Sequence, residues 1–157
     1  MGKFSVLKLV VSVVVIMALG AAGGIVTITQ ITTWYAQLNK PFFNPPNSIF
    51  VPVWTFLYAS MGVSFYLLWN SPVSYKKNRA MLFFVIQFLL NMAWSLIFFY
   101  FHETGWALAE ILVMWLFILL TIVYSASVQK WAAWLLIPYL SWVCFAAILN
   151  FAIYVLN

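Results

Sequence analysis

Five long apolar runs divide the sequence, and almost every charged residue lies between them rather than within them. The runs cover residues 9–29, 48–69, 80–101, 105–127 and 131–156. Each has about the 20 residues that an α-helix needs to cross ~30 Å of hydrocarbon. A spanning segment must pair its own backbone N–H and C=O groups, and runs of this length can do so only as helices. The pattern predicts an all-α integral membrane protein, a single domain over residues 1–157 that forms a bundle of five transmembrane helices.

The connection at residues 30–47 is the only long one, and it is too aromatic for a freely solvated loop, with Trp34, Tyr35, Phe42 and Phe43. Its prolines prevent a continuous helix and lower the entropy of the free loop, so ordering it costs less. We predict that it folds back as a lid over the non-cytoplasmic mouth of a binding pocket, with Lys40 and Asn44 outermost. The residues assigned to this lid are Trp34, Lys40, Pro41, Asn44, Pro45 and Pro46.

Composition agrees with a membrane protein, because 67% of the residues are hydrophobic, which excludes an ordinary soluble domain. The net charge of +5 resembles that of a nucleic-acid-binding protein, but in this context it is explained by membrane lipid headgroups, and no nucleic-acid partner is expected. If the five helices alternate, six basic residues lie on one side and only Lys40 on the other. The positive-inside bias then places the N-terminus in the cytoplasm. The six are Lys3, Lys8, Lys76, Lys77, Arg79 and Lys130.

The first apolar run has a second interpretation. Lys3 and Lys8, followed by an apolar stretch and by small residues at 18–21, resemble a secretory signal peptide with a cleavage site. Apolar character continues through Ile28, however, which is long enough for a true transmembrane helix. We expect the segment to be retained.

The spacing within the runs predicts a pocket between the helices. Residues at i, i+4, i+7 and i+8 share one helix face, and four of the runs each have an aromatic face with a polar or small residue. Gly62, Ala146 and Ala147 leave space beside these rings, and apolar walls with a few polar groups are typical of a small-molecule pocket. The alternative is that the polar residues only bond neighbouring helices. The faces are Trp54, Tyr58 and Gly62; Gln87, Asn91, Trp94, Ser95 and Phe98; Trp106, Glu110 and Met114; and Trp142, Ala146, Leu149 and Asn150.

Reactive residues are scarce. Glu110 is the only carboxylate inside a run, and it is either a functional group or a side chain solvated near the membrane surface. One histidine and two carboxylates cannot form a catalytic triad or a metal site, so neither a metal nor a bound cofactor is expected. His102 lies in a turn and is a poor haem ligand, and Cys144 is expected to be an inert thiol. Gly20 and Gly24 form a GxxxG spacing, which is weak evidence for self-association.

Several motifs resemble the translocator protein family, whose members are also called tryptophan-rich sensory proteins or peripheral-type benzodiazepine receptors. The resemblance covers nearly the whole chain in order. It is carried by Trp34-Tyr35, Leu38-x-Lys40-Pro41, Asn44-Pro45-Pro46, Pro52-x-Trp54-x-x-Leu57-Tyr58, Gln87-x-x-x-Asn91-x-x-Trp94, Ile97-Phe98-Phe99, Gly105-Trp106-Ala107-Leu108, Pro138-Tyr139-x-x-Trp142 and Leu149-Asn150.

The resemblance implies a commonly dimeric five-helix bundle that binds porphyrins and synthetic isoquinolines in a pocket closed by the first loop. Mitochondrial members also bind cholesterol, but residues 149–157 have Phe for the motif's Tyr and no basic residue after it, which makes cholesterol recognition by that route doubtful. The short tail and the charge bias favour a bacterial inner-membrane member. The implied ligand-binding residues are Tyr35, Trp54, Tyr58, Asn91, Trp94, Trp106, Trp142, Ala146 and Leu149.

Three functions fit these expectations. The first is a membrane-bound tetrapyrrole-binding protein or sensor, because flat aromatic walls suit a planar macrocycle. The lack of an axial ligand favours metal-free protoporphyrin IX over haem. The second is an enzyme that degrades porphyrin in light, as some bacterial relatives are reported to do, with Trp54 and Trp142 as its catalytic residues. The third is a transporter of porphyrin or other amphiphiles, which the missing internal repeats disfavour mildly. The first two need the same pocket.

Overall fold

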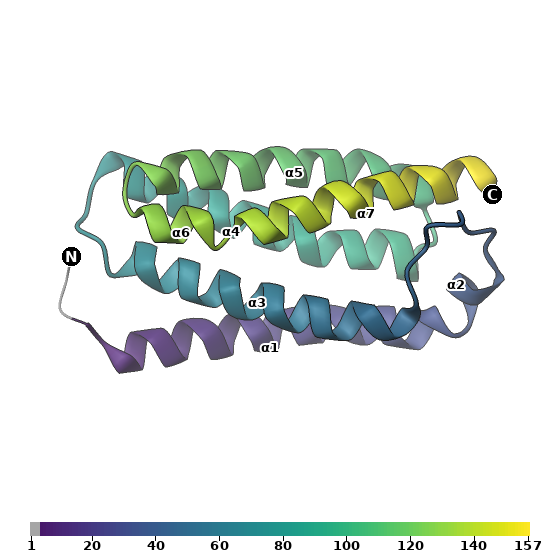
Figure 1. Cartoon of the computed structure of the whole chain (residues 1–157), viewed down its shortest axis with the longest axis horizontal. Coiled ribbons are helices and arrows are strands. Elements are labelled where there is room, and N and C mark those ends of the chain that lie inside the picture. The colour runs from purple at the N-terminus through teal and green to yellow at the C-terminus, as the bar shows by residue number, and fades with distance from the viewer. Residues whose placement is uncertain (1–3) are drawn as a thin grey trace.

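The computed structural model describes residues 4–157, and within that range the chain is a bundle of helices without strands (Figure 1). Five segments are long and apolar enough to cross a membrane, so the predicted all-α bundle of five spans is confirmed. They are formed by α1 (Val6–Ile31), α3 (Asn47–Trp69), α4 (Tyr75–Ser95) with the π-helical η1 (Leu96–Tyr100), α5 (Thr104–Ala126), and α6 (Lys130–Trp134) with α7 (Ile137–Leu156). The short helix α2 (Trp34–Gln37) lies in the first connection.

Local sequence explains where these helices begin. The hydroxyl of Ser5 accepts a hydrogen bond from the Lys8 N–H at 3.4 Å and caps α1, and Ser74 caps α4 in the same way through the Lys77 N–H at 3.2 Å. Both satisfy donors that the first turn of a helix leaves unpaired. The Lys77 ammonium in turn donates to the carbonyls of Trp69 and Ser71 at the end of α3.

The last span is not the continuous helix predicted over residues 131–156. It is interrupted at Leu135 and Leu136, between α6 and α7. Pro138 explains the break, because its ring lacks an N–H and would clash with the carbonyl four residues earlier in a continuous helix. Just before the break, the Ser64 hydroxyl of α3 donates a hydrogen bond to the Ala132 carbonyl of α6 at 2.8 Å. This bond joins α6 to α3.

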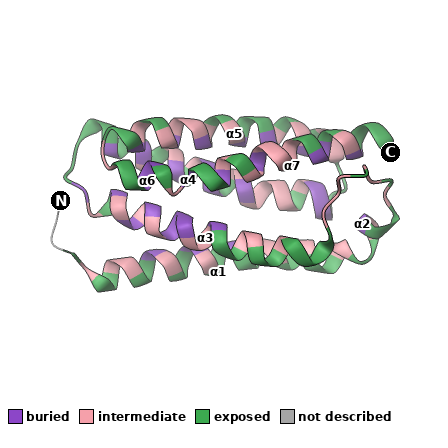
Figure 2. Ribbon diagram, viewed as in Figure 1, coloured by how far each residue is buried: buried purple, intermediate pink, exposed green. Residues whose placement is uncertain are grey.

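Helix α1 packs against α3, α4 packs against α5, and α5 packs against α7. Buried positions face the interior of the bundle and exposed ones face outward (Figure 2). The α1–α3 contact is very close at Gly62, where an added Cβ would lie 2.6 Å from the Cα of Val13. The prediction that Gly62 leaves room for a ligand is therefore wrong, because the backbone of α1 occupies that space.

The described basic residues separate toward the two ends of the bundle as predicted. Lys8 in α1, the basic residues at the start of α4 (Lys76, Lys77 and Arg79) and Lys130 at the start of α6 lie at the end where the chain begins (Figure 1). Lys40 follows α2 at the opposite end, where its neighbour Asn39 bonds to Asn157. Lys3 falls outside the described residues. An odd number of spans puts the two ends of the chain on opposite faces, as the figure shows.

Candidate ligand-binding cavity

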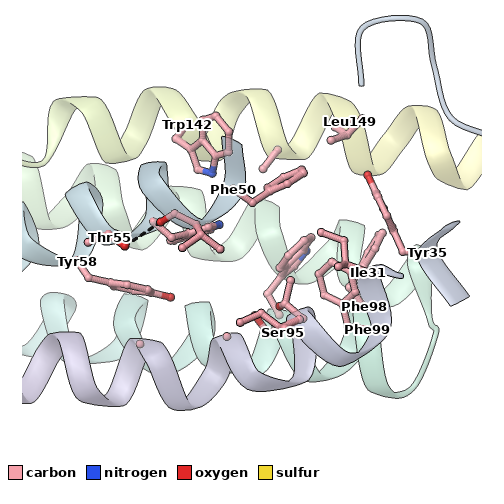
Figure 3. Close-up of a pocket in the computed structure, with 18 of the residues that line it drawn as sticks. Ile31, Tyr35, Phe50, Thr55, Tyr58, Ser95, Phe98, Phe99, Trp142 and Leu149 are labelled. Carbon is pink, nitrogen blue, oxygen red and sulfur yellow. Dashed lines mark hydrogen bonds between the residues drawn. The ribbon is translucent and has the colours of Figure 1, made fainter. Parts of the chain in front are cut away.

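A cavity of about 250 Å³ lies in the half of the bundle that contains α2, between α1, α3, η1 and α7 (Figure 3). Its lining includes seven of the nine ligand-binding residues predicted from the sequence. They come from α2, α3, α4 and α7, so distant parts of the chain converge on one space. The seven are Tyr35, Trp54, Tyr58, Trp94, Trp142, Ala146 and Leu149.

The other two predicted residues lie elsewhere. Asn91 is buried behind the wall, where its side-chain oxygen accepts a hydrogen bond from the Tyr58 hydroxyl at 2.8 Å. Trp106 faces outward and is 71% exposed, so its predicted place in the pocket does not match the structure. The inward position of that turn of α5 is taken by Ala107, which is fully buried. Adjacent positions on a helix point about 100° apart, and the motif alone did not show which of the two faced inward.

Helix α1 contributes a wall of the cavity that was not among the helix faces predicted from the sequence. Its lining residues recur at intervals of three and four, which defines one helix face. They are Met17, Gly20, Ala21, Gly24, Thr27, Ile28 and Ile31. Small residues in the middle of this face leave the space that larger ones would fill, and Gly20 lies directly against the Tyr58 ring. The Gly20–Gly24 spacing thus shapes a cavity within one chain.

Flat aromatic surfaces form the opposite walls. The rings of Trp54 and Tyr58 stack with centroids 5.2 Å apart, and those of Trp94 and Phe98 stack at 5.0 Å. The rings of Phe50 and Trp142 are nearly perpendicular, with centroids 6.2 Å apart. Phe50 also lines the cavity, although it was not among the helix faces predicted from the sequence. Such rings suit a planar, apolar ligand.

Two indole N–H donors at the cavity are free. The indole N–H of Trp94 donates to Asn150 at 3.2 Å and that of Trp115 donates to Cys144 at 2.9 Å. Within residues 4–157, the indole N–H groups of Trp54 and Trp142 have no acceptor. Figure 3 shows the Trp142 ring directed from α7 into the cavity. Since an indole N–H at depth normally finds a partner, these two donors are available to an acceptor on a ligand.

The first connection covers the end of the cavity through Tyr35, which is 3% exposed. The Tyr35 hydroxyl donates to the side-chain oxygen of Asn44 at 2.7 Å, and the Lys40 ammonium lies 4.9 Å from the ring centroid. Burial raises the pKa of Tyr35 to about 12, so this hydroxyl keeps its proton and its donor role at neutral pH. The prediction that Lys40 and Asn44 lie outermost is wrong, because both fold back onto Tyr35 and Phe42 is the fully exposed residue.

Two contacts hold this connection to the bundle. Asn39 and Asn157 exchange hydrogen bonds: the Asn39 N–H donates to the Asn157 side-chain oxygen at 2.9 Å, and the Asn157 amide donates to the Asn39 carbonyl at 3.0 Å. The Trp34 ring stacks on His102 with centroids 4.2 Å apart. The loop is therefore ordered by specific partners at the end of α7 and in the α4–α5 turn.

Replacing Asn157 by leucine is expected to loosen the lid, because both side-chain hydrogen bonds to Asn39 are lost. At about 1 kcal/mol net for each bond, or about 2 kcal/mol for the two, amide exchange in residues 36–44 should speed up by roughly thirtyfold. Hydrogen–deuterium exchange with mass spectrometry would measure this, with residues 70–74, which connect α3 and α4, as internal control. Equal exchange of the lid in both proteins would contradict the anchoring role.

These features define an integral multi-pass membrane protein with an aromatic cavity inside its helix bundle. Residues 12–156 match the model of the TspO/MBR family. The chain is 42% identical to the Tryptophan-rich protein TspO of Archaeoglobus fulgidus over 98% of this chain and 99% of that protein. It is 36% identical to the Tryptophan-rich sensory protein of Cereibacter sphaeroides, over 79% and 77%, and 38% identical to the Translocator protein of Ovis aries, over 75% and 71%. The protein belongs to the TspO/MBR family, which confirms the resemblance seen in its motifs.

Proposed function

We propose that the protein binds a planar tetrapyrrole, metal-free protoporphyrin IX, in this cavity and acts as a membrane-bound sensor of it. The observation that carries the proposal is the pair of free indole N–H groups on Trp54 and Trp142 beside stacked aromatic walls. A porphyrin supplies a flat apolar face for the rings and carboxylate oxygens for the donors. The single histidine lies outside the cavity, stacked on Trp34, and this favours the metal-free ligand over haem.

Access to the cavity supports an amphiphilic ligand that arrives from the membrane. Three residues line the cavity and are also exposed on the outside of the bundle: Ile28 of α1, and Val51 and Thr55 of α3. They mark an opening between α1 and α3 toward the lipid. A planar apolar molecule dissolved in the bilayer can enter there without crossing the lid. The lid then separates the ligand from water at the end of the bundle.

The distribution of basic residues supports one orientation in the membrane. We propose that the chain lies in a bacterial inner membrane with its N-terminus in the cytoplasm, because the basic residues gather at that end of the bundle. The opposite end contains the lid and Lys40. In this orientation the lid faces the non-cytoplasmic side.

Titration with protoporphyrin IX tests the proposal, using quenching of intrinsic tryptophan fluorescence in detergent. Trp54→Ala and Trp142→Ala should each weaken affinity by at least about 1 kcal/mol, or roughly fivefold, because each removes an aromatic surface and a donor. Trp106→Ala is the matched control and should bind as the wild type does, since that ring lies outside the cavity. Unchanged affinity in both cavity variants, with intact folding, would reject this site.

A further inference from the structure

Two lysines from different helices meet at Trp69, the last residue of α3. The Lys8 ammonium of α1 lies 5.4 Å from the centroid of the Trp69 ring, within the range of a cation–π contact. The Lys77 ammonium of α4 donates to the backbone carbonyls of Trp69 and Ser71 at 2.8 and 2.6 Å. The charge of Lys8 is near enough to the Lys77 ammonium to repel it. We call Lys8, Trp69 and Lys77 together the Trp69 site.

No acidic side chain balances these two positive charges. Glu103 and Glu110 are the only acidic residues of the sequence, and they lie where α5 begins, at the end of the bundle that contains the lid (Figure 1). Lys77 is 7% exposed and is held in place by its two carbonyl partners. Lys8 is only half-buried, and its ammonium has no hydrogen-bond acceptor among residues 4–157. Lys8 therefore offers three unused donors beside a second, fixed positive charge.

The exposed surface of α1 next to the Trp69 site is apolar. Val11 and Val15 follow Lys8 at positions i+3 and i+7 and so share its face of the helix, and they are 40% and 47% exposed. This face runs toward the middle of a membrane span, where it meets hydrocarbon. Trp69 ends its own span, and an indole ring there lies at the level of the lipid headgroups. Positive charge at headgroup level above an apolar track matches the two parts of an anionic phospholipid.

We propose that the Trp69 site binds the phosphate of one anionic phospholipid, of the phosphatidylglycerol class, with an acyl chain along Val11 and Val15. The Lys8 ammonium would donate charge-assisted hydrogen bonds to the phosphate oxygens. Lys77 would keep its two carbonyl partners and attract the phosphate through its charge alone. Both lysines act from the positions that they have in the structure. A basic pocket between transmembrane helices is a known way to hold such a headgroup.

A specific lipid site differs from the general attraction of a basic surface to the membrane. Lys76 precedes Lys77 on α4 and carries the same charge, but it is exposed and takes no part in the Trp69 site. Adjacent positions on a helix point about 100° apart, so Lys76 serves as a matched control for charge alone. The Trp69 site shares no residue with the tetrapyrrole cavity and does not depend on the function proposed for that cavity.

Native mass spectrometry of the full chain in a neutral detergent tests the proposal, with dioleoyl phosphatidylglycerol as the titrant. The first lipid should bind at least about tenfold more tightly than dioleoyl phosphatidylcholine, whose quaternary ammonium the lysines repel. Lys8→Gln should weaken this binding by at least about tenfold, equivalent to ~1.4 kcal/mol. Lys8→Arg should retain it, because a guanidinium keeps the charge and the donors. Lys76→Gln should change it by less than about threefold.

Thermal unfolding gives a second readout, the rise in midpoint that phosphatidylglycerol causes within each variant, which does not depend on the variant's own stability. The wild type and Lys76→Gln should show this rise, and Lys8→Gln should not. Equal effects of Lys8→Gln and Lys76→Gln in both measurements would overturn the proposal, because diffuse charge would then attract the lipid. Equal affinity for phosphatidylcholine would also overturn it. Excess inorganic phosphate should not displace the lipid, and displacement would instead assign the site to a soluble phosphate and reject the lipid.

Discussion

Replacing Gly62 by alanine should lower the free energy of unfolding by at least about 2 kcal/mol, in the range typical of overpacking a close contact. The new methyl carbon would lie 2.6 Å from the Cα of Val13 and 3.1 Å from a methyl group of the same residue. A backbone atom cannot rotate away, so α1 and α3 must move apart along their contact. That movement would loosen buried neighbours such as Ile16 and Leu57.

The matched control is Gly23→Ala on α1. There the nearest atom to an added Cβ is the flexible Met92 side chain at 4.0 Å, an ordinary contact. Because alanine favours a helix over glycine by about 1 kcal/mol, this variant should be as stable as the wild type or more so. Unfolding in dodecyl maltoside with increasing dodecyl sulfate, followed by tryptophan fluorescence, would compare the two. Equal stability of Gly62→Ala and the wild type would refute the close-contact argument.

The helices could be predicted because membrane thickness fixes how long an apolar run must be. The predicted starts of the second, fourth and fifth spans fall within one residue of α3, α5 and α6. The two helix starts that differ most from the prediction, those of α1 and α4, are set by capping residues outside the apolar runs. Helix α1 begins at Val6 because Ser5 caps it, and α4 begins at Tyr75 because Ser74 caps it, so polar residues extend both helices beyond their hydrophobic part.

The cavity could be predicted only in part, because helical spacing gives a face but not its neighbour. Trp54, Tyr58 and Gly62 share a face of α3, yet the first two line the cavity and Gly62 touches α1. Which part of a face is open depends on where two helices diverge, and this is decided by close contacts such as that of Gly20 with the Tyr58 ring. The wall from α1 was visible in the sequence as a row of small residues at intervals of three and four.

The lid shows a different limit. Its aromatic residues and prolines predicted that it would fold back, but the partners that hold it are single polar side chains far away in the sequence. Asn39 bonds to Asn157, and no local pattern connects two asparagines 118 positions apart. The sequence did not predict that Lys40 folds back onto Tyr35. This position is stabilised by hydrogen bonds from its ammonium to two acceptors within the loop itself, the carbonyls of Ala36 and Leu38.

Gly24→Phe should reduce protoporphyrin IX affinity by more than about tenfold, or ~1.4 kcal/mol, while leaving the fold stable. Gly24 lines the cavity, and an added Cβ there meets no atom within 4 Å, so a phenyl group can enter the open space without displacing the backbone. A cavity of about 250 Å³ that holds an extra ring has little room left for a macrocycle. The substitution adds no tryptophan, so fluorescence quenching measures its affinity on the same scale as that of the wild type.

Gly23→Phe provides the matched control, because it places the same side chain on the next residue of the same helix. Gly23 does not line the cavity, and its position points about 100° away from that of Gly24. It should retain wild-type affinity for protoporphyrin IX. If Gly24→Phe bound the porphyrin as tightly as Gly23→Phe does, the ligand would have to bind outside this cavity, and the assignment of Trp54 and Trp142 as its donors would fail with it.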